Sequence, residues 1–475
     1  MTTERATAEL GWRPNGARDT SGRPRRKVLV LAYRFPPQGG GGVQRSLKFV
    51  KYLPEQGWLP IVQTVSNPYW PLQDATLLSE IPPFVKVHGT RTFEFERLGR
   101  ATEGLIAPRE NASATGAGSG PRRSGVRQML KGAAGLVQRH ALVPDPQITW
   151  VPGAFLKGLS LIRKERPAVI YSSSPPNSCQ ILGLMLKRAT HVPWIADFRD
   201  PWTEGIRRKQ SYERSGVRRR LEHAFERRVI EGADHVIVTT EKTLEQFVAK
   251  YPAIPSSKYS VITNGFDAAD FTVTRDGDRL LDNSLFNVTL TGNVETMFDA
   301  EPFFTAIRDL VHEDGGLRAH LRINFVGTKR GKYDDFIDHH RLETNVRYIG
   351  YVPHQTSLRY LAESDVLFLC QIPVYESATT KLSGKLFEYL YMRKPILALT
   401  LPGLTTDILS RSGLGVAVDP NDQPGIKKAV RDLYLRWREG GANLHADEAY
   451  IATFDRARQT ERLAAIFDRF AGTRS

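Results

Sequence analysis

The sequence predicts an α/β protein made of two Rossmann-like domains, each with a parallel sheet. Buried strand-like runs alternate with helical segments almost throughout the chain, the alternation begins again after about residue 265, and the two halves are similar in size. Ligands of such sheets bind beyond the carboxyl ends of the strands, so we expect the two domains to face a central cleft.

The first half carries short apolar runs bounded by turn residues, the pattern of buried parallel strands. A helix is predicted over 43–57. Strands are predicted at 27–33, 58–65, 168–175, 193–198 and 235–240. Residues 1–26 are polar and basic and are predicted to be a disordered tail rather than an export signal. The Gly/Ser/Ala-rich stretch at about 107–126 is predicted to be a flexible insertion in a domain that covers 27–265.

The second half repeats this organisation after a junction near residue 265. Strands are predicted at 286–292, 321–327, 345–350, 365–370, 395–400 and 414–419, with helices of about 10 to 15 residues between most of them. We expect a second Rossmann-like domain over 266–445, followed by a C-terminal helix within 446–475 that crosses back to the first domain.

The composition is that of a globular protein without extracellular features. The 475 residues include 41% hydrophobic and 25% charged side chains, and no uncharged apolar run is long enough to span a bilayer. The two cysteines, Cys179 and Cys370, have no partner at metal-binding spacing, which favours a reducing compartment. We therefore expect a cytoplasmic protein.

Part of the net charge of +15 is concentrated in Arg207–Arg228, which holds nine basic and three acidic side chains. Apolar Leu221, Phe225 and Val229 recur there at helical spacing. Such a helix suits the anionic inner face of a cell membrane, and the alternatives are a solvated helix or a polyanion site. No nucleic-acid-binding module accompanies it, so we expect no nucleic acid partner.

The segment FPPQGGGGVQRS, Phe35–Ser46, follows the first predicted strand. It lacks the Lys-Ser/Thr of a Walker A loop, and if Gly39 and Gly41 begin a dinucleotide fingerprint, Gln44 occupies the place of the third glycine. The segment is instead predicted to be a flexible loop that presents backbone N–H groups to an anion at the start of a helix. The alternative is a disordered connector.

A second informative stretch is TTKLSGKLFEYLYMRKPILAL, residues 379–399. Ser383 is a candidate N-cap, and Gly384 leaves the start of the following helix sterically open. Lys385 and Glu388 are three residues apart on one face of its first turn. A diphosphate would gain from the helix N-terminus and the Lys385 ammonium, and Glu388 could accept hydrogen bonds from a ribose diol. The alternative is a surface ion pair.

Together these stretches resemble a known enzyme family. The chain is similar, over about residues 27–470, to GT-B glycosyltransferases of family four, which use nucleotide-sugar donors and retain the anomeric configuration. The resemblance lies in PPQGGGGVQR, VITNGFD, NVRYIGYVPHQTSLRYLAESDVLFL and SGKLFEYLYMRKPILAL. SSSPPNS and PWIADFRDPW resemble a subgroup that assembles bacterial surface polysaccharides.

The resemblance implies a set of donor-binding residues. The glycine loop would approach the donor phosphate and the transferring sugar, and Glu388 would bind the ribose. The remaining implied positions are Gly41 and Gly42 in the glycine loop, Gly292 and Asn293 near the diphosphate, and Tyr351 and Val352 around the nucleobase.

Two departures from the family pattern concern the same site. The position of the first of the family's paired glutamates, eight residues before Glu388, is Thr380, and the nearby Glu376 is out of register. The Arg and Lys that usually follow the first strand of the donor domain are also missing. Lys385, helped by Lys329 or Arg330, is then expected to neutralise the diphosphate.

Asp197, Arg199 and Asp200 end a predicted strand of the first domain in the sequence ADFRDPW. Carboxylates around an arginine could orient an acceptor hydroxyl, and the resemblance puts Asp197 or Asp200 near the donor sugar. The alternative is an internal ion-pair cluster. The spacing of DFRD is not that of an Asp-x-Asp metal motif, so we expect no metal.

The expected activity is that of a retaining, metal-independent glycosyltransferase without a cofactor. It would move a sugar, of the hexosyl kind, from a nucleotide diphosphate to a hydroxyl of a glycan or lipid-linked intermediate at the inner membrane face. Asp197, Lys385 and Glu388 are its candidate catalytic residues. The family is thought to need no separate strong base, because the leaving diphosphate can receive the acceptor proton. The alternatives are a nucleotide-sugar epimerase on the same fold and an inactive GT-B scaffold.

Overall fold

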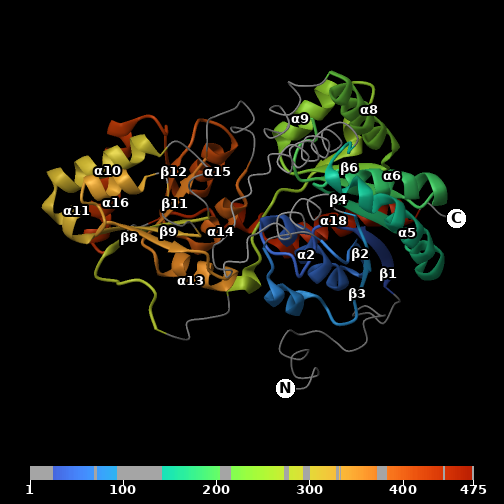
Figure 1. The fold of residues 1–475 in the computed structure, drawn as a ribbon, viewed down its shortest axis with the longest axis horizontal. Coiled ribbons are helices and arrows are strands. Elements are labelled where there is room, and N and C mark those ends of the chain that lie inside the picture. Colours follow the sequence, from blue (N-terminus) through green and yellow to red (C-terminus); the bar gives the residue numbers. More distant parts are fainter. Residues whose placement is uncertain are drawn as a thin grey trace, which may run out of the picture. The chain divides into compact units, whose positions relative to one another are not determined.

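The chain folds into two compact units (Figure 1). The computed structural model describes residues 25–68, 72–93, 142–203, 216–271, 278–292, 300–327, 331, 333–371, 382–441 and 444–472. Unit 1 comprises residues 1–261 and 460–475, and unit 2 comprises residues 262–459. Residues 1–24 of the predicted tail, the predicted insertion, and the first part of the basic segment up to residue 215 lie outside the described residues. Arg26, which the prediction placed in the tail, is the first residue of a strand.

Unit 1 is built on a seven-stranded parallel sheet in the order β3-β2-β1-β4-β5-β6-β7. Its strands are β1 (Arg26–Leu31), β2 (Trp58–Val65), β3 (Lys86–Thr90), β4 (Val169–Ser174), β5 (Trp194–Phe198), β6 (His235–Val238) and β7 (Tyr259–Val261). The strand order reverses between β1 and β4, and a crevice beyond that point is the usual ligand site of a doubly wound sheet.

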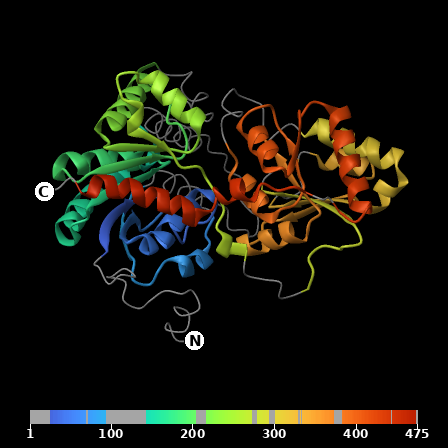
Figure 2. The same cartoon turned by 180° about the vertical axis from the view of Figure 1, so that it is seen from behind.

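The helices of unit 1 connect these strands. They are α2 (Gly41–Tyr52), α5 (Val151–Glu165), α6 (Ser178–Thr190), α8 (Gly216–Gly232) and α9 (Glu241–Lys250), with 3-10 turns at Leu53–Gln56, Ala75–Glu80, Pro146–Trp150 and Ser256–Lys258. The long helix α18 (Arg456–Ala471) begins in unit 2 and continues into unit 1. There it runs along the sheet (Figure 2), and its buried Phe467 packs edge-on against Trp58 and Tyr171.

Unit 2 has a six-stranded parallel sheet in the order β10-β9-β8-β11-β12-β13, and its order reverses between β8 and β11. Its strands are β8 (Phe286–Thr291), β9 (Leu321–Val326), β10 (Val346–Gly350), β11 (Val366–Cys370), β12 (Ile396–Leu399) and β13 (Gly415–Val418). Its helices are α10 (Glu301–Glu313), α11 (Gly315–His320), α12 (Asp334–His339), α13 (His354–Glu363), α14 (Gly384–Met392), α15 (Leu404–Ser412), α16 (Gln423–Arg438) and α17 (Glu448–Ala452), with a 3-10 turn at Ala268–Phe271.

The predicted fold class is confirmed, and each predicted strand is present within a few residues of its expected bounds. Two strands, β3 and β7, were not predicted. Among the described residues, no helix is both long enough and apolar enough to cross a membrane.

Candidate active site

The switch point of the unit 2 sheet is held together by Tyr389 of α14. Its buried hydroxyl donates to the carbonyl of Phe368 in β11 at 3.2 Å and accepts from the backbone N–H of Thr291 in β8 at 3.1 Å. One side chain thus ties α14 to the ends of β8 and β11. Because of this tie, the start of α14 is fixed beside the crevice where a doubly wound sheet binds its ligand.

Lys385 reaches from the first turn of α14 to the residue that follows β8. Its Nζ lies over Gly292, so close that a Cβ at residue 292 would overlap it. Gly292 has φ of 105°, a conformation that favours glycine, and donates its N–H to the carbonyl of Val326 at 2.6 Å. Gly327 is equally confined, since a Cβ there would lie 3.2 Å from the backbone of Gly292. These glycines leave room for a cation at the crevice.

The surroundings of Lys385 make its ammonium group more acidic than that of an ordinary lysine. Burial lowers its pKa to about 8, and the negative charge of Glu388, one turn further along α14, partly opposes this. Cys370, at the end of β11, also interacts electrostatically with Lys385, and burial raises the pKa of its thiol well above the usual range. The structure thus brings the predicted residues Gly292, Lys385 and Glu388 together in unit 2.

The start of α14 is open as expected. Ser383 has the extended backbone of an N-cap residue, but its side chain makes no capping hydrogen bond. None of the described residues has an atom within 4 Å of the place where a Cβ at Gly384 would lie. Backbone N–H groups at an uncapped helix start carry partial positive charge, which suits an anion.

The other predicted donor residues divide into two groups. Tyr351 and Val352 follow β10, two strands away from β8, and Tyr351 is 59% exposed. Asn293, Lys329, Arg330, Thr380 and Glu376 lie outside the described residues.

The glycine loop of unit 1 forms hydrogen bonds with neighbouring residues, and its predicted flexibility stays a prediction. Gln38 is buried and donates its side-chain amide to the carbonyl of Tyr33 at 3.0 Å. Gly39 donates its N–H to the carbonyl of Leu72 at 2.9 Å. Gly40, with φ of 92°, occupies the N-cap position of α2 and has no side chain to cap it. The loop follows β1 and therefore lies at the switch point of the unit 1 sheet.

Gly41 and Gly42 form the first turn of α2. A Cβ at Gly41 would meet no atom of the described part of the chain within 4 Å, whereas one at Gly42 would lie 3.1 Å from Arg34 Cδ. Arg34 directly precedes the loop and had no role in the sequence prediction. Its only signal in the sequence is its position immediately after the first strand.

Asp197 at the end of β5 is completely buried and forms an ion pair with Arg45 of α2, which is 1% exposed. Both carboxylate oxygens accept from the guanidinium at 2.8 Å. These contacts match the internal ion-pair cluster, which is the alternative interpretation of this segment. The roles predicted for Asp197 in catalysis and acceptor binding stay predictions. Arg199 and Asp200 are partly buried and interact electrostatically with each other.

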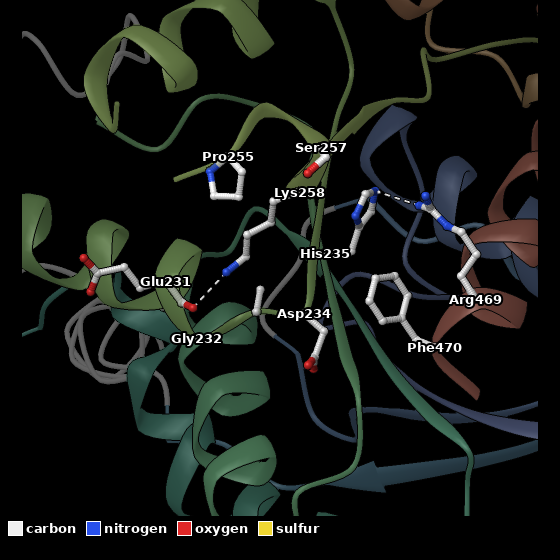
Figure 3. A pocket seen from close by; sticks show the side chains of 10 residues that line it. Glu231, Gly232, Asp234, His235, Pro255, Ser257, Lys258, Arg469 and Phe470 are labelled. Atoms are coloured by element: carbon white, nitrogen blue, oxygen red, sulfur yellow. Dashed lines mark hydrogen bonds between the residues drawn. The ribbon is translucent and has the colours of Figure 1, made fainter. Parts of the chain in front are cut away.

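A pocket of about 540 Å³ lies at the opposite edge of the unit 1 sheet, where β6 and β7 begin (Figure 3). Lys258 crosses it and donates to the carbonyl of Glu231 at 2.8 Å, close to the end of α8. Burial, with the positive charges of Arg469 and Lys258, lowers the pKa of His235 there to about 4. The two cations of this pocket, Lys258 and Arg469, lie near the C-terminal ends of α8 and α18. There they offset the partial negative charge of the helix ends. The candidate functional residues are therefore those at the switch point of each sheet, considered for each unit by itself.

Comparison with known proteins shows the family of the chain. Family models described as a glycosyl transferase 4-like domain and as glycosyl transferases group 1 match residues 115–265 and 285–436, which together exceed half of the chain. No curated protein sequence matches.

Solved structures share the fold at low sequence identity. Sucrose-phosphate synthase from Thermosynechococcus elongatus aligns over 94% of this chain and 96% of its own, with 13% identity and a TM-score of 0.51. HepE from Anabaena, in complex with UDP-glucose, aligns over 94% and 99%, with 14% identity and a TM-score of 0.51. The UDP-GlcNAc 2-epimerase from Methanocaldococcus jannaschii aligns over 93% and 99%, with 10% identity and a TM-score of 0.50.

Proposed function

The chain belongs to the glycosyltransferases of the GT-B fold, and we propose that it moves a sugar from a nucleoside diphosphate to a hydroxyl acceptor with retention of configuration. The observation that carries the proposal is the position of the Lys385 ammonium over Gly292, beside the uncapped start of α14. A buried cation and a helix N-terminus stabilise the charge that grows on a departing diphosphate.

In this reaction the bond between the anomeric carbon and the diphosphate oxygen breaks as the acceptor oxygen bonds to the same face of that carbon. The acceptor proton passes to the departing diphosphate, so no further base is required. Lys385 and the α14 N-terminus neutralise the diphosphate without a metal ion, and Glu388 accepts from the ribose hydroxyls. Residues Tyr351 and Val352 border the nucleobase. Catalysis then depends on positioning and on stabilising the leaving group.

The first experiment identifies the nucleotide. The nucleoside diphosphate that belongs in the site should raise the melting temperature more than the others in a panel of UDP, GDP, ADP and dTDP. A ligand at one hundred times its Kd stabilises the folded state by about 2.7 kcal/mol.

The second experiment measures release of that nucleotide from its sugar derivatives in the presence of an acceptor extract. Lys385→Ala should abolish release, whereas Lys427→Ala on the surface helix α16 should leave it unchanged. Full activity of the Lys385 variant would refute the proposed donor site. A 2-epimer formed without an acceptor would identify an epimerase, and nucleotide binding without turnover would identify an inactive scaffold.

We further propose that the acceptor is a lipid-linked or polysaccharide intermediate, which the enzyme meets at an anionic membrane surface. The support comes from α8, where two of the three acidic side chains, Glu222 and Glu226, are buried. Buried Glu222 bonds to Arg218 and Trp202, and buried Glu226 bonds to Lys250 at 2.5 Å. The outward surface of α8 is therefore mainly basic and partly apolar, with one exposed carboxylate, Glu231, which pairs with Arg227 at 2.7 Å.

The outward surface of α8 carries exposed apolar side chains, which favour contact with a bilayer over contact with water. Val217 is 69% exposed and Leu221 is 44% exposed. Four exposed arginines lie on the same helix, at positions 219, 220, 227 and 228, and one of them, Arg227, is paired with Glu231. Apolar side chains can enter the headgroup region while the arginines contact anionic phosphates.

Liposome flotation tests this surface. The protein should float with phosphatidylglycerol vesicles, and neutralising Arg219, Arg220 and Arg228 to Gln should abolish flotation. Replacing the exposed Lys428, Arg436 and Arg438 of α16 by Gln removes the same charge from unit 2 and should leave flotation unchanged. Equal loss in both variants would indicate a general charge effect and contradict a docking surface on α8.

A further inference from the structure

Two side chains of the ADFRDPW segment contact the helix that follows the glycine loop. Asp197 is bonded to Arg45 in the second turn of α2, and the guanidinium Nη1 of Arg199 donates to the carbonyl of Gly42 in the first turn. Residues that are more than 150 positions apart in the sequence are thereby joined at the carboxyl edge of the unit 1 sheet.

The carboxylate of Asp197 is completely buried and is occupied mainly at Oδ2. Besides the two bonds from Arg45, its Oδ2 accepts from the Tyr171 hydroxyl at 2.6 Å and from the Ser173 hydroxyl at 3.2 Å. Three of the four donors share Oδ2, and Oδ1 accepts from Arg45 alone among the described residues. Because Asp197 is 0% exposed, an acceptor hydroxyl could reach this carboxylate only if the side chains around it moved.

Arg199 acts on backbone atoms alone in its hydrogen bonds to the described residues. Its Nε donates to the carbonyl of Ser174 at 3.0 Å, and its Nη2 donates to that of Pro175 at 2.6 Å. With the bond to Gly42, one planar guanidinium connects the loop after β4 to the start of α2 across the switch point. Arginine suits this task because its donors have a rigid, forked geometry.

We propose that Asp197 and Arg199 are positioning residues, which fix the start of α2 and the glycines before it through Arg45 and the Gly42 carbonyl. A glycine loop is intrinsically mobile, and its N–H groups can stabilise a developing charge only if they are held in place beforehand. The clamp, meaning Arg45, Asp197 and Arg199 with Gly42, performs this task. Its catalytic consequence rests on the proposed function, whereas the fixing of the loop does not.

Hydrogen–deuterium exchange of the full chain tests the clamp directly. In Arg199→Met, amides in peptides that cover residues 39–47 should exchange about tenfold faster than in the wild type, because local opening becomes easier. Arg199→Lys keeps the charge and at least one donor, so the amides of residues 39–47 should exchange at an intermediate rate. If Arg199→Met fails to fold, the exchange rate of Arg199→Lys tests the clamp in its place. Lys187→Met removes a partly buried ion pair with Asp234 in the same unit and should leave residues 39–47 unchanged.

Kinetics provide a second measurement. The kcat of Arg199→Met should fall about tenfold, since small errors of position are costly. Its Kd for the nucleoside diphosphate should stay within about twofold, because Lys385 and Glu388 in unit 2 are unchanged. Unaltered exchange in Arg199→Met, or an equal rise in Lys187→Met, would overturn the proposal. A wild type without transferase activity would refute the proposed function, and the exchange data would still decide whether the clamp exists.

Discussion

The ammonium of Lys385 lies over the α-carbon of Gly292, at the point where β8 leaves the sheet. The lysine can reach this place because residue 292 has no side chain and the backbone of Gly327 packs beneath it. A cation that depends on the absence of a neighbouring methyl group is sensitive to very small changes.

Gly292→Ala should lower the affinity for the nucleoside diphosphate by about tenfold or more. The new Cβ displaces the Lys385 ammonium, and alanine also resists a φ of 105°. Isothermal titration calorimetry would measure the change. Gly315→Ala, at a position in unit 2 where a Cβ meets no atom within 4 Å, is the matched control and should bind normally. Binding within twofold of the wild type in the Gly292 variant would contradict the assigned role of Lys385.

Nucleotide affinity should decrease as the pH rises from 7 to 9. The pKa of Lys385 is lowered to about 8, so its ammonium is mostly charged at pH 7 and mostly neutral at pH 9. Only the charged form attracts the diphosphate, and each pH unit above the pKa removes up to about tenfold of that attraction. Calorimetric titrations across this range should show the decrease in the wild type.

The same titrations of Lys385→Gln should show weak binding with little dependence on pH. Lys394→Gln serves as the control, because Lys394 is another lysine of unit 2 whose pKa is lowered by burial. It should retain the decrease. A wild-type affinity that stays constant between pH 7 and 9 would show that Lys385 does not pair with the diphosphate.

Arg45→Met should destabilise unit 1 by about 3–5 kcal/mol, because it leaves the buried carboxylate of Asp197 without its countercharge. The double variant Arg45→Met/Asp197→Leu should recover much of this loss, since it removes both charges. Urea unfolding followed by tryptophan fluorescence would measure both. A double variant as unstable as Arg45→Met alone would show that lost packing, rather than an unpaired charge, dominates.

Most of the sheet architecture could be predicted because buried parallel strands are continuous apolar runs, such as β1 and β11. β3 was missed because its sequence KVHGT is mostly exposed and carries no apolar pattern. β7 is only three residues long and lies in a segment whose Asn, Gly and Asp residues indicate a junction. Short strands at a sheet edge contribute little periodicity for a sequence to display.

The candidate site was predictable where its residues are close in sequence. Lys385 and Glu388 share a helical turn, so their common face follows from spacing alone. The pairing of Asp197 with Arg45 could not be predicted, because it depends on which helix crosses the end of β5. The inward direction of Glu222 and Glu226 was hidden for a similar reason, since a count of charges does not show which face of a helix is buried.

The course of α18 has a consequence for the synthesis of the protein. Unit 2 is inserted between residues 261 and 460 of unit 1, and buried Phe467 completes the packing around Trp58 and Tyr171. The Trp58 indole also donates to Asp468 at 3.0 Å. Until the ribosome has added α18, the sheet of unit 1 lacks a helix that covers it. The strands of unit 1 are translated before unit 2, but their packing is completed only after unit 2 has been translated.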